Sequence, residues 1–159
     1  MMITIRTMTE ADDEIASRIA AACYRFTAEP DQLTDEQLNG ALHQWCTSAY
    51  MAVSRAKDIA IVAEIDGEVV GVAATRGDSL MEMFVDLSYH RKGVGGALFR
   101  SAEQTVASCG HSVVRVKTTN SALPFYAAMG MRQVQMYAPE AGAFVGTTMF
   151  ALEKDIAPQ

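Results

Sequence analysis

Cysteine is scarce in this sequence, and the few residues present are scattered. Cys23, Cys46 and Cys109 are the only three in 159 residues, and no two of them form a Cys-x-x-Cys pair. An odd number of widely spaced cysteines is neither a disulfide framework nor a structural zinc pattern. We therefore expect small, mostly buried side chains at these positions, and a functional site that uses no metal.

Long apolar runs and an excess of positive charge are also missing. The opening residues 1–6 lack the apolar core of a signal peptide, and no stretch approaches membrane-spanning length. Thirteen Lys and Arg against 19 Asp and Glu leave a net charge of −6, without a basic stripe. Because phosphate neutralisation dominates nucleic-acid binding, nucleic acid is not an expected partner. The sequence predicts a cytoplasmic protein that binds neither nucleic acid nor membrane.

Repeats, linkers and low-complexity segments are absent as well. Half of the residues are apolar and a fifth are charged, which is ordinary for a soluble globular protein. We therefore expect a single domain over residues 1–159.

Hydrophobic periodicity and turn residues predict an alternation of strands and helices. Strands are expected at 3–7, 59–65, 68–75, 80–86, 112–117, 131–138 and 144–152. Helices are expected at 10–27, from the Thr34 cap to about Val53, from Val94 to a stop at Gly110, and briefly before Gly130. Asp66-Gly67 predicts a tight hairpin, and the tail from Lys154 is expected to fray. The predicted order is β-α-α-β-β-β-α-β-α-β-β.

The segment from Phe84 to Leu98 dominates the sequence. A short apolar run ends in a polar turn with Arg91 and Lys92, and three glycines follow within the next four residues. Glycine lets another group approach the backbone closely, and the free N–H groups at a helix start favour an anion. The pattern predicts an anion-binding strand–loop–helix.

Two common nucleotide loops fit this segment poorly. A P-loop needs Lys-Ser/Thr after its last glycine, and the dinucleotide fingerprint needs a glycine where Leu98 stands. The simplest alternative is a tight turn that only caps a helix.

Two motifs together resemble a known family. Tyr89-His90-Arg91-Lys92-Gly93-Val94-Gly95-Gly96-Ala97-Leu98 resembles the acetyl-CoA-binding motif of the GNAT superfamily of N-acetyltransferases, written Arg/Gln-x-x-Gly-x-Gly/Ala. Phe125-Tyr126-Ala127-Ala128-Met129-Gly130-Met131 resembles the second signature of that family, aromatic-Tyr-x-x-x-Gly-Phe. His90 departs from Arg or Gln at the first motif position, and Met131 replaces the final Phe.

The resemblance implies a fold and an activity. The fold is α/β (α+β), with a mixed, mostly antiparallel central sheet of about seven strands flanked by about four helices. The activity is that of an acetyl-CoA-dependent N-acetyltransferase, an acyltransferase that releases coenzyme A and needs no metal. It also allows a homodimer that pairs through the last strands.

The resemblance further assigns cofactor contacts. Main-chain amides of the glycine loop would hold the pyrophosphate, and the pantetheine arm would pair like an extra strand with the fourth strand. Asn120 matches a position that commonly contacts the cofactor. The implied contacts are Phe84, Val85, Arg91, Lys92, Gly93, Val94, Gly95, Gly96 and Asn120.

For catalysis, the family pattern implies direct attack by an amine on the thioester, without an acyl-enzyme. Tyr126 would protonate the departing sulfur, and an amide near Val85 would stabilise the oxyanion. Glu82 is our candidate for the general base, because a buried carboxylate in this apolar strand would have a raised pKa. Asp86 and His90 are further options, and Glu82 on a solvated strand face is the competing interpretation.

The acceptor is less defined. A small-molecule amine is the favoured hypothesis. In this fold, helices one and two shape the acceptor site, and here they have no obvious peptide-binding signature. They carry His43, Trp45, Tyr50 and Met51. A protein N-terminus or lysine is the second hypothesis. A regulatory module that binds acyl-CoA without turnover is the third, and Tyr126 argues against it.

Overall fold

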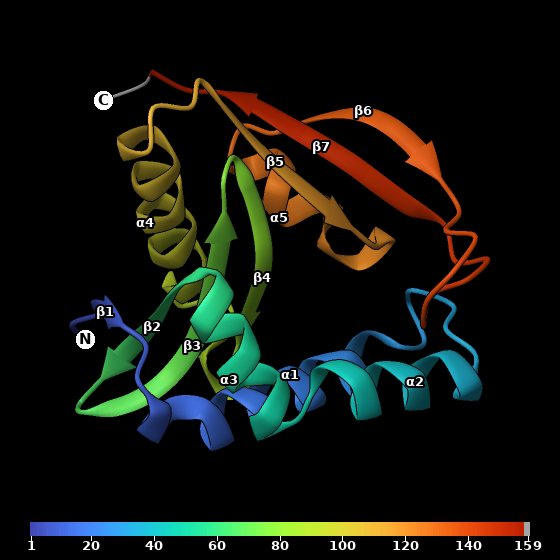
Figure 1. The fold of residues 1–159 in the computed structure, drawn as a ribbon, viewed down its shortest axis with the longest axis horizontal. Helices are drawn as coiled ribbons and strands as arrows, with labels where there is room; N and C mark the ends of the chain where they lie inside the picture. The colour runs from blue at the N-terminus through green and yellow to red at the C-terminus, as the bar shows by residue number, and fades with distance from the viewer. Residues whose placement is uncertain (158–159) are drawn as a thin grey trace.

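The computed structural model describes residues 1–157, and its core is one sheet of seven strands (Figure 1). The strands are β1 Thr4–Thr7, β2 Ile59–Ile65, β3 Glu68–Arg76, β4 Ser79–Val85, β5 Val113–Thr118, β6 Arg132–Tyr137 and β7 Met149–Asp155. The α-helices are α1 Asp13–Thr27, α2 Asp35–Trp45, α3 Ser48–Lys57, α4 Val94–Ser108 and α5 Leu123–Ala128. Three short 3₁₀ turns complete the order: η1 Glu10–Asp12, η2 Leu87–Tyr89 and η3 Asn120–Ala122.

The sheet has the strand order β1-β2-β3-β4-β5-β7-β6 and is antiparallel except at one junction. There β4 and β5 run parallel and pair only at Ser79↔Arg115 and Leu80↔Val116. Beyond Leu80 the two strands separate, so the rest of β4 has no strand neighbour on that side. The predicted mixed, mostly antiparallel sheet of about seven strands is confirmed.

Helices cover both faces of this sheet. Alternate residues of β2 and β3 pack on α1 and α3 through a cluster that includes Ala16, Met51 and Val72. The opposite face packs on α4 and α5 through a larger cluster that includes Leu98 and Tyr126. The predicted burial of both faces of β2 and β3 is confirmed, as is the tight turn at Asp66-Gly67, where both residues have positive φ.

The predicted second helix is in fact two helices. Its capping box is present, because Thr34 Oγ1 accepts from the Gln37 N–H at 3.1 Å and the Gln37 side chain accepts from the Thr34 N–H at 2.9 Å. The helix ends at Trp45, and Thr47 caps α3 by accepting from the Tyr50 N–H at 3.0 Å. Apolar spacing continues across the break, so the periodic pattern alone could not reveal it.

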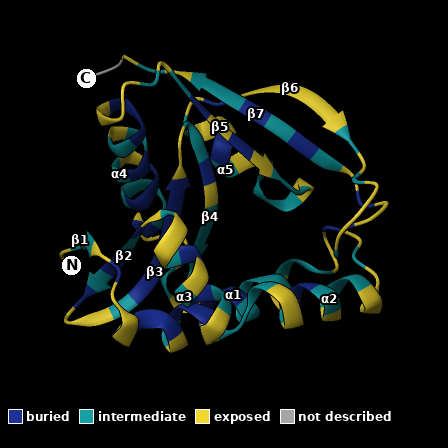
Figure 2. Ribbon diagram, in the orientation of Figure 1, coloured by how far each residue is buried: buried dark blue, intermediate teal, exposed yellow. Residues whose placement is uncertain are grey.

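The C-terminal strands also differ from the prediction. β7 begins at Met149 rather than 144 and continues to Asp155, so Lys154 and Asp155 are part of the sheet rather than a frayed tail. Gly142 and Gly146 have positive φ and keep residues 138–148 in a loop. The predicted fraying at 158–159 lies outside the described residues. Figure 2 shows that β6 forms an exposed edge of the sheet.

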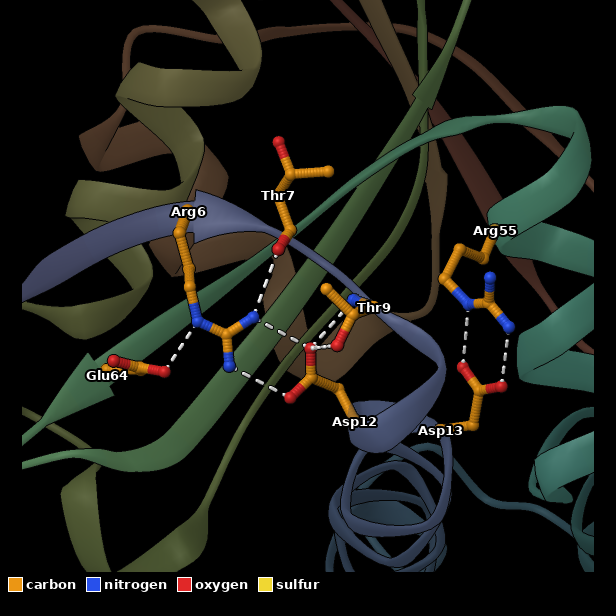
Figure 3. Close-up of polar contacts among 7 residues, drawn as sticks. All are labelled: Arg6, Thr7, Thr9, Asp12, Asp13, Arg55 and Glu64. Carbon is orange, nitrogen blue, oxygen red and sulfur yellow. Dashed lines mark hydrogen bonds and ion pairs between the residues drawn. The ribbon is translucent and has the colours of Figure 1, made fainter.

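A polar network fixes the start of the chain to the sheet (Figure 3). The Arg6 guanidinium donates to both carboxylate oxygens of Asp12, at 2.8 and 2.9 Å, and to Glu64 at 2.5 Å. Asp12 also accepts from the Thr9 N–H at 2.8 Å, as the predicted capping box requires. These contacts connect β1 and β2 to the turn that begins α1.

Asp12→Asn is expected to lower the free energy of unfolding by about 1–3 kcal/mol at neutral pH, because charge-assisted hydrogen bonds to a nearly buried group are lost. Hydrogen bonds from Arg6 lower the pKa of Asp12 below its ordinary value of 3.8. The stabilisation is therefore present above that value and is lost as the pH falls through the lower pKa of the folded state. Urea denaturation across this pH range measures it.

The matched control for Asp12→Asn is Asp155→Asn, because the Asp155 side chain is 74% exposed in its ion pair with Arg132. This variant should change stability little. An Asp12→Asn variant as stable as the wild type at neutral pH would contradict the structural role of the network.

Candidate active site

The loop between β4 and α4 has an unusual backbone. Asp86 accepts from the Ser88 N–H at 2.8 Å and closes the turn η2. The chain then passes through Arg91, with φ of 64°, and Gly93, with φ of 88°. The left-handed conformation suits glycine and is strained for arginine. The chain thus turns sharply just before α4.

The start of α4 presents unpaired amides. The first intrahelical bond runs from the Ala97 N–H to the Gly93 carbonyl at 3.1 Å, so the N–H groups of Val94, Gly95 and Gly96 have no partner within the helix. Acidic residues occupy the first turns of α1 and α2, whereas the first turn of α4 has none. The positive end of the helix dipole is therefore left for an external anion.

The loop and the first turns of α4 carry three cations. Arg91 and Lys92 are exposed on the loop, as the sequence predicts. Arg100 is a third that the sequence reading missed: a Cβ built on Gly96 would lie 3.2 Å from an Nη atom of Arg100. Arg100 lies four residues after Gly96, and side chains four residues apart share a helix face. This spacing is the signal in the sequence that could have identified it.

Gly95 also has a packing role that its motif position does not indicate. A Cβ there would lie 3.1 Å from the Phe125 ring and 3.8 Å from Val85. Gly95 therefore lets α5 approach α4 and the end of β4. The glycine loop and the second signature are in direct contact, which places the loop beside Tyr126.

Arg91→Gly is expected to raise the free energy of unfolding by about 0.5–1 kcal/mol, because glycine adopts a positive φ without strain. The same change should weaken acetyl-CoA binding, since a cation beside the amides is lost. Thermal denaturation and titration calorimetry measure the two effects.

Arg91→Ala is the matched control for Arg91→Gly. It removes the same charge but keeps a Cβ at a positive φ, so it should weaken binding without stabilising the fold. If Arg91→Gly is no more stable than Arg91→Ala, backbone strain at this position is refuted.

The free side of β4 is lined by main-chain groups. The Asp86 N–H donates to the Val70 carbonyl at 2.8 Å, so the main chain of Asp86 faces β3. Main-chain groups alternate in direction along an antiparallel pair, so those of Phe84 also face β3 while those of Met83 and Val85 face the gap toward β5. Of the two strand residues predicted to bind pantetheine, Val85 presents its main chain to this gap and Phe84 does not.

Two side chains already contact this gap. His90 Nε2 donates to the Val85 carbonyl at 2.7 Å, and the Cys23 thiol donates to the same oxygen at 3.2 Å. Burial raises the pKa of Cys23 to about 11, so at neutral pH it is a thiol and not a nucleophilic thiolate. His90 and Cys23 therefore orient the end of β4.

Tyr126 lies on the α4 side of the sheet. Its side chain is 6% exposed and packs between the rings of Phe99 and Phe125, with centroids 6.2 and 5.1 Å away. Burial raises the pKa of the phenol, so it is protonated at neutral pH. Because no hydrogen bond joins its hydroxyl to another residue in 1–157, the proton is available to a ligand.

Glu82 lies on the opposite side of the sheet, toward α3. Desolvation by burial raises the pKa of its carboxyl group, and the nearby hydroxyls of Tyr50 and Ser54 offset part of that shift. They do not complete its bonding, because Oε1 is buried with no hydrogen-bond partner. A buried carboxylate with an unused oxygen is suited to accept a proton.

The other candidate bases are engaged elsewhere. The Asp86 carboxylate caps η2, and the His90 ring is hydrogen-bonded to the Val85 carbonyl. His43, which the sequence indicates only as a residue of the helices that shape the acceptor site, is exposed on α2 and donates to the Asn39 carbonyl of its own helix at 2.7 Å. Glu82 alone among these residues combines burial with an unpartnered oxygen.

An aromatic cluster forms the wall next to Glu82. Tyr24 packs against Phe84, Trp45 and Phe144, with ring centroids 5.4, 6.0 and 5.9 Å away, and Trp45 packs against Phe144 at 5.2 Å. The sequence reading singled out Trp45 but missed Tyr24 and Phe144. Phe144 belongs to the loop before β7, whose approach to the α2 region is visible in Figure 1.

Asn120 sits where β5 ends and is held in place by its neighbours. The Asp31 carboxylate, in the connection between α1 and α2, accepts from Thr119 Oγ1 at 2.7 Å and from the Ser121 N–H and Oγ at 2.6 and 2.7 Å. Asn120 itself is exposed and lines a pocket of about 470 Å³. The other lining residues are Pro30, Asp31, Gln32, Thr34, Gln37, Gly146, Thr147, Thr148 and Phe150. The predicted cofactor contact thus borders an open pocket.

The described residues contain neither a metal-binding cluster nor a membrane-spanning helix. No group of three or more His, Cys, Asp and Glu side chains in 1–157 is arranged to hold a metal. Within the same range, no helix has both the length and the apolarity needed to span a bilayer.

Comparison with known proteins identifies the family. The acetyltransferase (GNAT) domain family matches residues 29–149, which is more than half of the chain. No curated protein sequence matches significantly.

Solved structures share the fold. A GCN5-related N-acetyltransferase from Rhodopseudomonas palustris superposes with a TM-score of 0.87 at 19% identity, covering 98% of this chain and 99% of that one. The PaiA N-acetyltransferase from Thermoplasma acidophilum, solved with coenzyme A, gives 0.76 at 16% identity, covering 98% and 99%. A phosphinothricin acetyltransferase from Sinorhizobium meliloti, solved with acetyl-CoA, gives 0.71 at 17% identity, covering 99% and 90%. The chain belongs to the GNAT family of acetyltransferases.

Proposed function

We propose that this protein transfers the acetyl group of acetyl-CoA directly to the primary amine of a small molecule. The observation that carries the proposal is the free edge of β4. Its main-chain groups at Met83 and Val85 face a gap with Tyr126 on one side of the sheet and Glu82 on the other.

The residues present fit acetyl-CoA. The amides of Val94, Gly95 and Gly96, with Arg91 and Lys92 beside them, would hold the pyrophosphate. The main chain of Met83 and the N–H of Val85 would pair with the amides of the pantetheine arm, as an edge strand pairs with a neighbour, while the Val85 carbonyl stays bonded to His90 and Cys23. The bound thioester supplies the electrophilic carbonyl carbon.

The chemistry then needs three proton transfers. Glu82 takes a proton from the ammonium form of the acceptor, and the free amine attacks the thioester carbon. A main-chain N–H of Met83 or Val85 donates to the thioester oxygen as negative charge develops on it. The carbon–sulfur bond breaks, and Tyr126 gives its proton to the departing sulfur. The newly acylated nitrogen then loses its second proton, which restores the Tyr126 phenol.

Direct transfer also agrees with the state of the nearby cysteines. Burial raises the pKa of both Cys23 and Cys46 to about 11, so neither is a thiolate at neutral pH. Cys109 is exposed at the far end of α4. An acyl-enzyme on any of them has no support in these environments.

A loop that packs against the acceptor side favours a small acceptor over a polypeptide. Phe144 packs between Tyr24 and Trp45, and the Gln37 side chain donates to the Val145 carbonyl at 2.8 Å. The loop before β7 is therefore docked on α2. The adjoining pocket of about 470 Å³ has the size of small-molecule sites.

Incubation with acetyl-CoA and a panel of primary amines tests the proposal. We expect free thiol to appear only when an amine is present, with one acetylated amine formed per thiol. Acetyl-CoA binding without amine-dependent thiol release would instead support the regulatory module, and acetylation of peptides alone would support the protein acceptor.

A further inference from the structure

The pocket beside Asn120 has a chemical character that the proposed reaction does not use. It lies between the α1–α2 connection and the segment that leads into β7, and neither Tyr126 nor Glu82 lines it. Its uncharged polar walls come from Gln32, Thr34, Gln37, Asn120, Thr147 and Thr148. These side chains offer hydroxyl and amide groups.

The pocket contains no free charge to bind an ion. Among the described residues that line it there is no Lys, Arg or His, and Asp31 is the one charged residue. Both Asp31 oxygens already accept hydrogen bonds, from Thr119 and Ser121. A carboxylate or phosphate placed here would lose water without gaining a counter-charge, and Asp31 would repel it.

Among the described residues that line this pocket, Thr147 has a buried side-chain hydroxyl that lacks a hydrogen-bond partner. The residue is 7% exposed, and its Oγ1 is buried without a hydrogen bond. An unsatisfied buried hydroxyl costs free energy, so its retention calls for an explanation such as an external partner. A neutral group that both donates and accepts, such as a ligand hydroxyl, would satisfy it.

A chain of contacts joins this pocket to the base side of the active site. The Thr147 N–H donates to the Phe144 carbonyl at 2.9 Å. Phe144 packs on Tyr24, which packs on Phe84, two residues along β4 from Glu82 and on the same face. This chain of contacts connects the pocket to the face of the sheet that carries Glu82.

We infer that this pocket binds the distal hydroxyl group of the amine acceptor, with Thr147 as a specificity-determining residue. The preferred acceptor is then an amine that carries an uncharged hydroxyl group, such as an amino alcohol or amino sugar. This inference rests on the proposed acetyl transfer and goes beyond it by naming the acceptor class.

The test compares three series of acceptors matched in chain length: aminoalkanes, the same chains ended by a hydroxyl, and the same chains ended by a carboxylate. The best hydroxyl-ended chain should exceed its aminoalkane in kcat/KM by about 10-fold or more, since a site built for a hydroxyl discriminates against its absence. The carboxylate-ended chain should be the poorest.

Thr147→Val keeps the shape of the side chain and removes the hydroxyl. It should reduce kcat/KM for the hydroxyl-ended chain to the level of the aminoalkane, while kcat/KM for the aminoalkane and the Kd of acetyl-CoA stay unchanged. The control is Thr7→Val, an exposed threonine on β1 whose hydroxyl makes no hydrogen bond to another described residue. It should keep the preference for the hydroxyl-ended chain.

Three results would overturn the inference while leaving acetyl transfer intact. They are equal kcat/KM for all three series, a preference that survives Thr147→Val, and weaker acetyl-CoA binding in Thr147→Val, which would assign the pocket to the cofactor. If no amine releases thiol, the proposed function fails, and the inference fails with it.

Discussion

Tyr126→Phe is expected to lower kcat by about 10- to 1,000-fold and to leave the Kd of acetyl-CoA unchanged, within the range of general acid catalysis. The reason is the isolation of the Tyr126 phenol. It is buried among Phe99 and Phe125, and its hydroxyl makes no hydrogen bond within residues 1–157. Removing the hydroxyl takes away the proton donor without breaking a hydrogen bond to the rest of the protein. Assays of free thiol release should therefore show slow turnover in a fully folded protein.

The control for Tyr126→Phe is Tyr137→Phe, which removes a phenolic hydroxyl from the edge strand β6. This variant should keep kcat. A Tyr126→Phe variant with wild-type kcat would remove Tyr126 from the mechanism. A loss of acetyl-CoA affinity would instead make it a binding residue.

Glu82→Gln is expected to lower kcat/KM at neutral pH by about 100-fold or more, within the range of general base catalysis. The wild type should lose activity toward acid as Glu82 becomes protonated, with an inflection above the ordinary value of 4.5 because burial raises the pKa of Glu82. Glutamine has no titrating group, so the variant should lack this acidic limb. Profiles of kcat/KM against pH for both proteins provide the measurement.

Glu82→Gln should raise the free energy of unfolding at neutral pH although it lowers activity. Because the pKa of Glu82 is raised in the folded state, folded protein binds more protons than unfolded protein above pH 4.5, and stability falls as the pH rises through that raised pKa. Glu82→Gln removes this cost. The variant should therefore have the higher free energy of unfolding at neutral pH and a similar value in acid, as expected where function is retained at the expense of stability.

Glu68→Gln on β3 is the control for Glu82→Gln, since Glu68 is exposed and its substitution should alter neither property. An acidic limb that persists in Glu82→Gln would exclude Glu82 as the base. A variant less stable than the wild type at neutral pH would show that the carboxylate is structural.

Much of the fold was accessible from local sequence signals. Thr9 with Asp12 and Thr34 with Gln37 marked two helix starts, and Asp66-Gly67 marked a hairpin. Each is a short-range pattern in which the residue type itself supplies the required hydrogen bond or backbone angle. The helix break at Cys46–Thr47 was not visible, because apolar spacing continues through it.

The candidate site could be predicted from the sequence only in part, for a different reason. The loop amides and Tyr126 could be placed from motifs, but Arg100, Tyr24, Phe144 and Thr147 come together only through tertiary packing. Gly95 shows the limit clearly: its motif suggests close approach to a phosphate, whereas its missing Cβ makes room for Phe125. Side-chain direction on a packed helix depends on neighbours that the sequence pattern does not identify.

The crystal structure of the protein with bound acetyl-CoA tests the central claim most directly. The account predicts that the pantetheine amides pair with the main chain of Met83 and Val85, and that the pyrophosphate lies on the amides at the start of α4. It also predicts the thioester sulfur within hydrogen-bonding distance of the Tyr126 hydroxyl. A cofactor bound elsewhere, or a sulfur that Tyr126 cannot reach, would contradict the account.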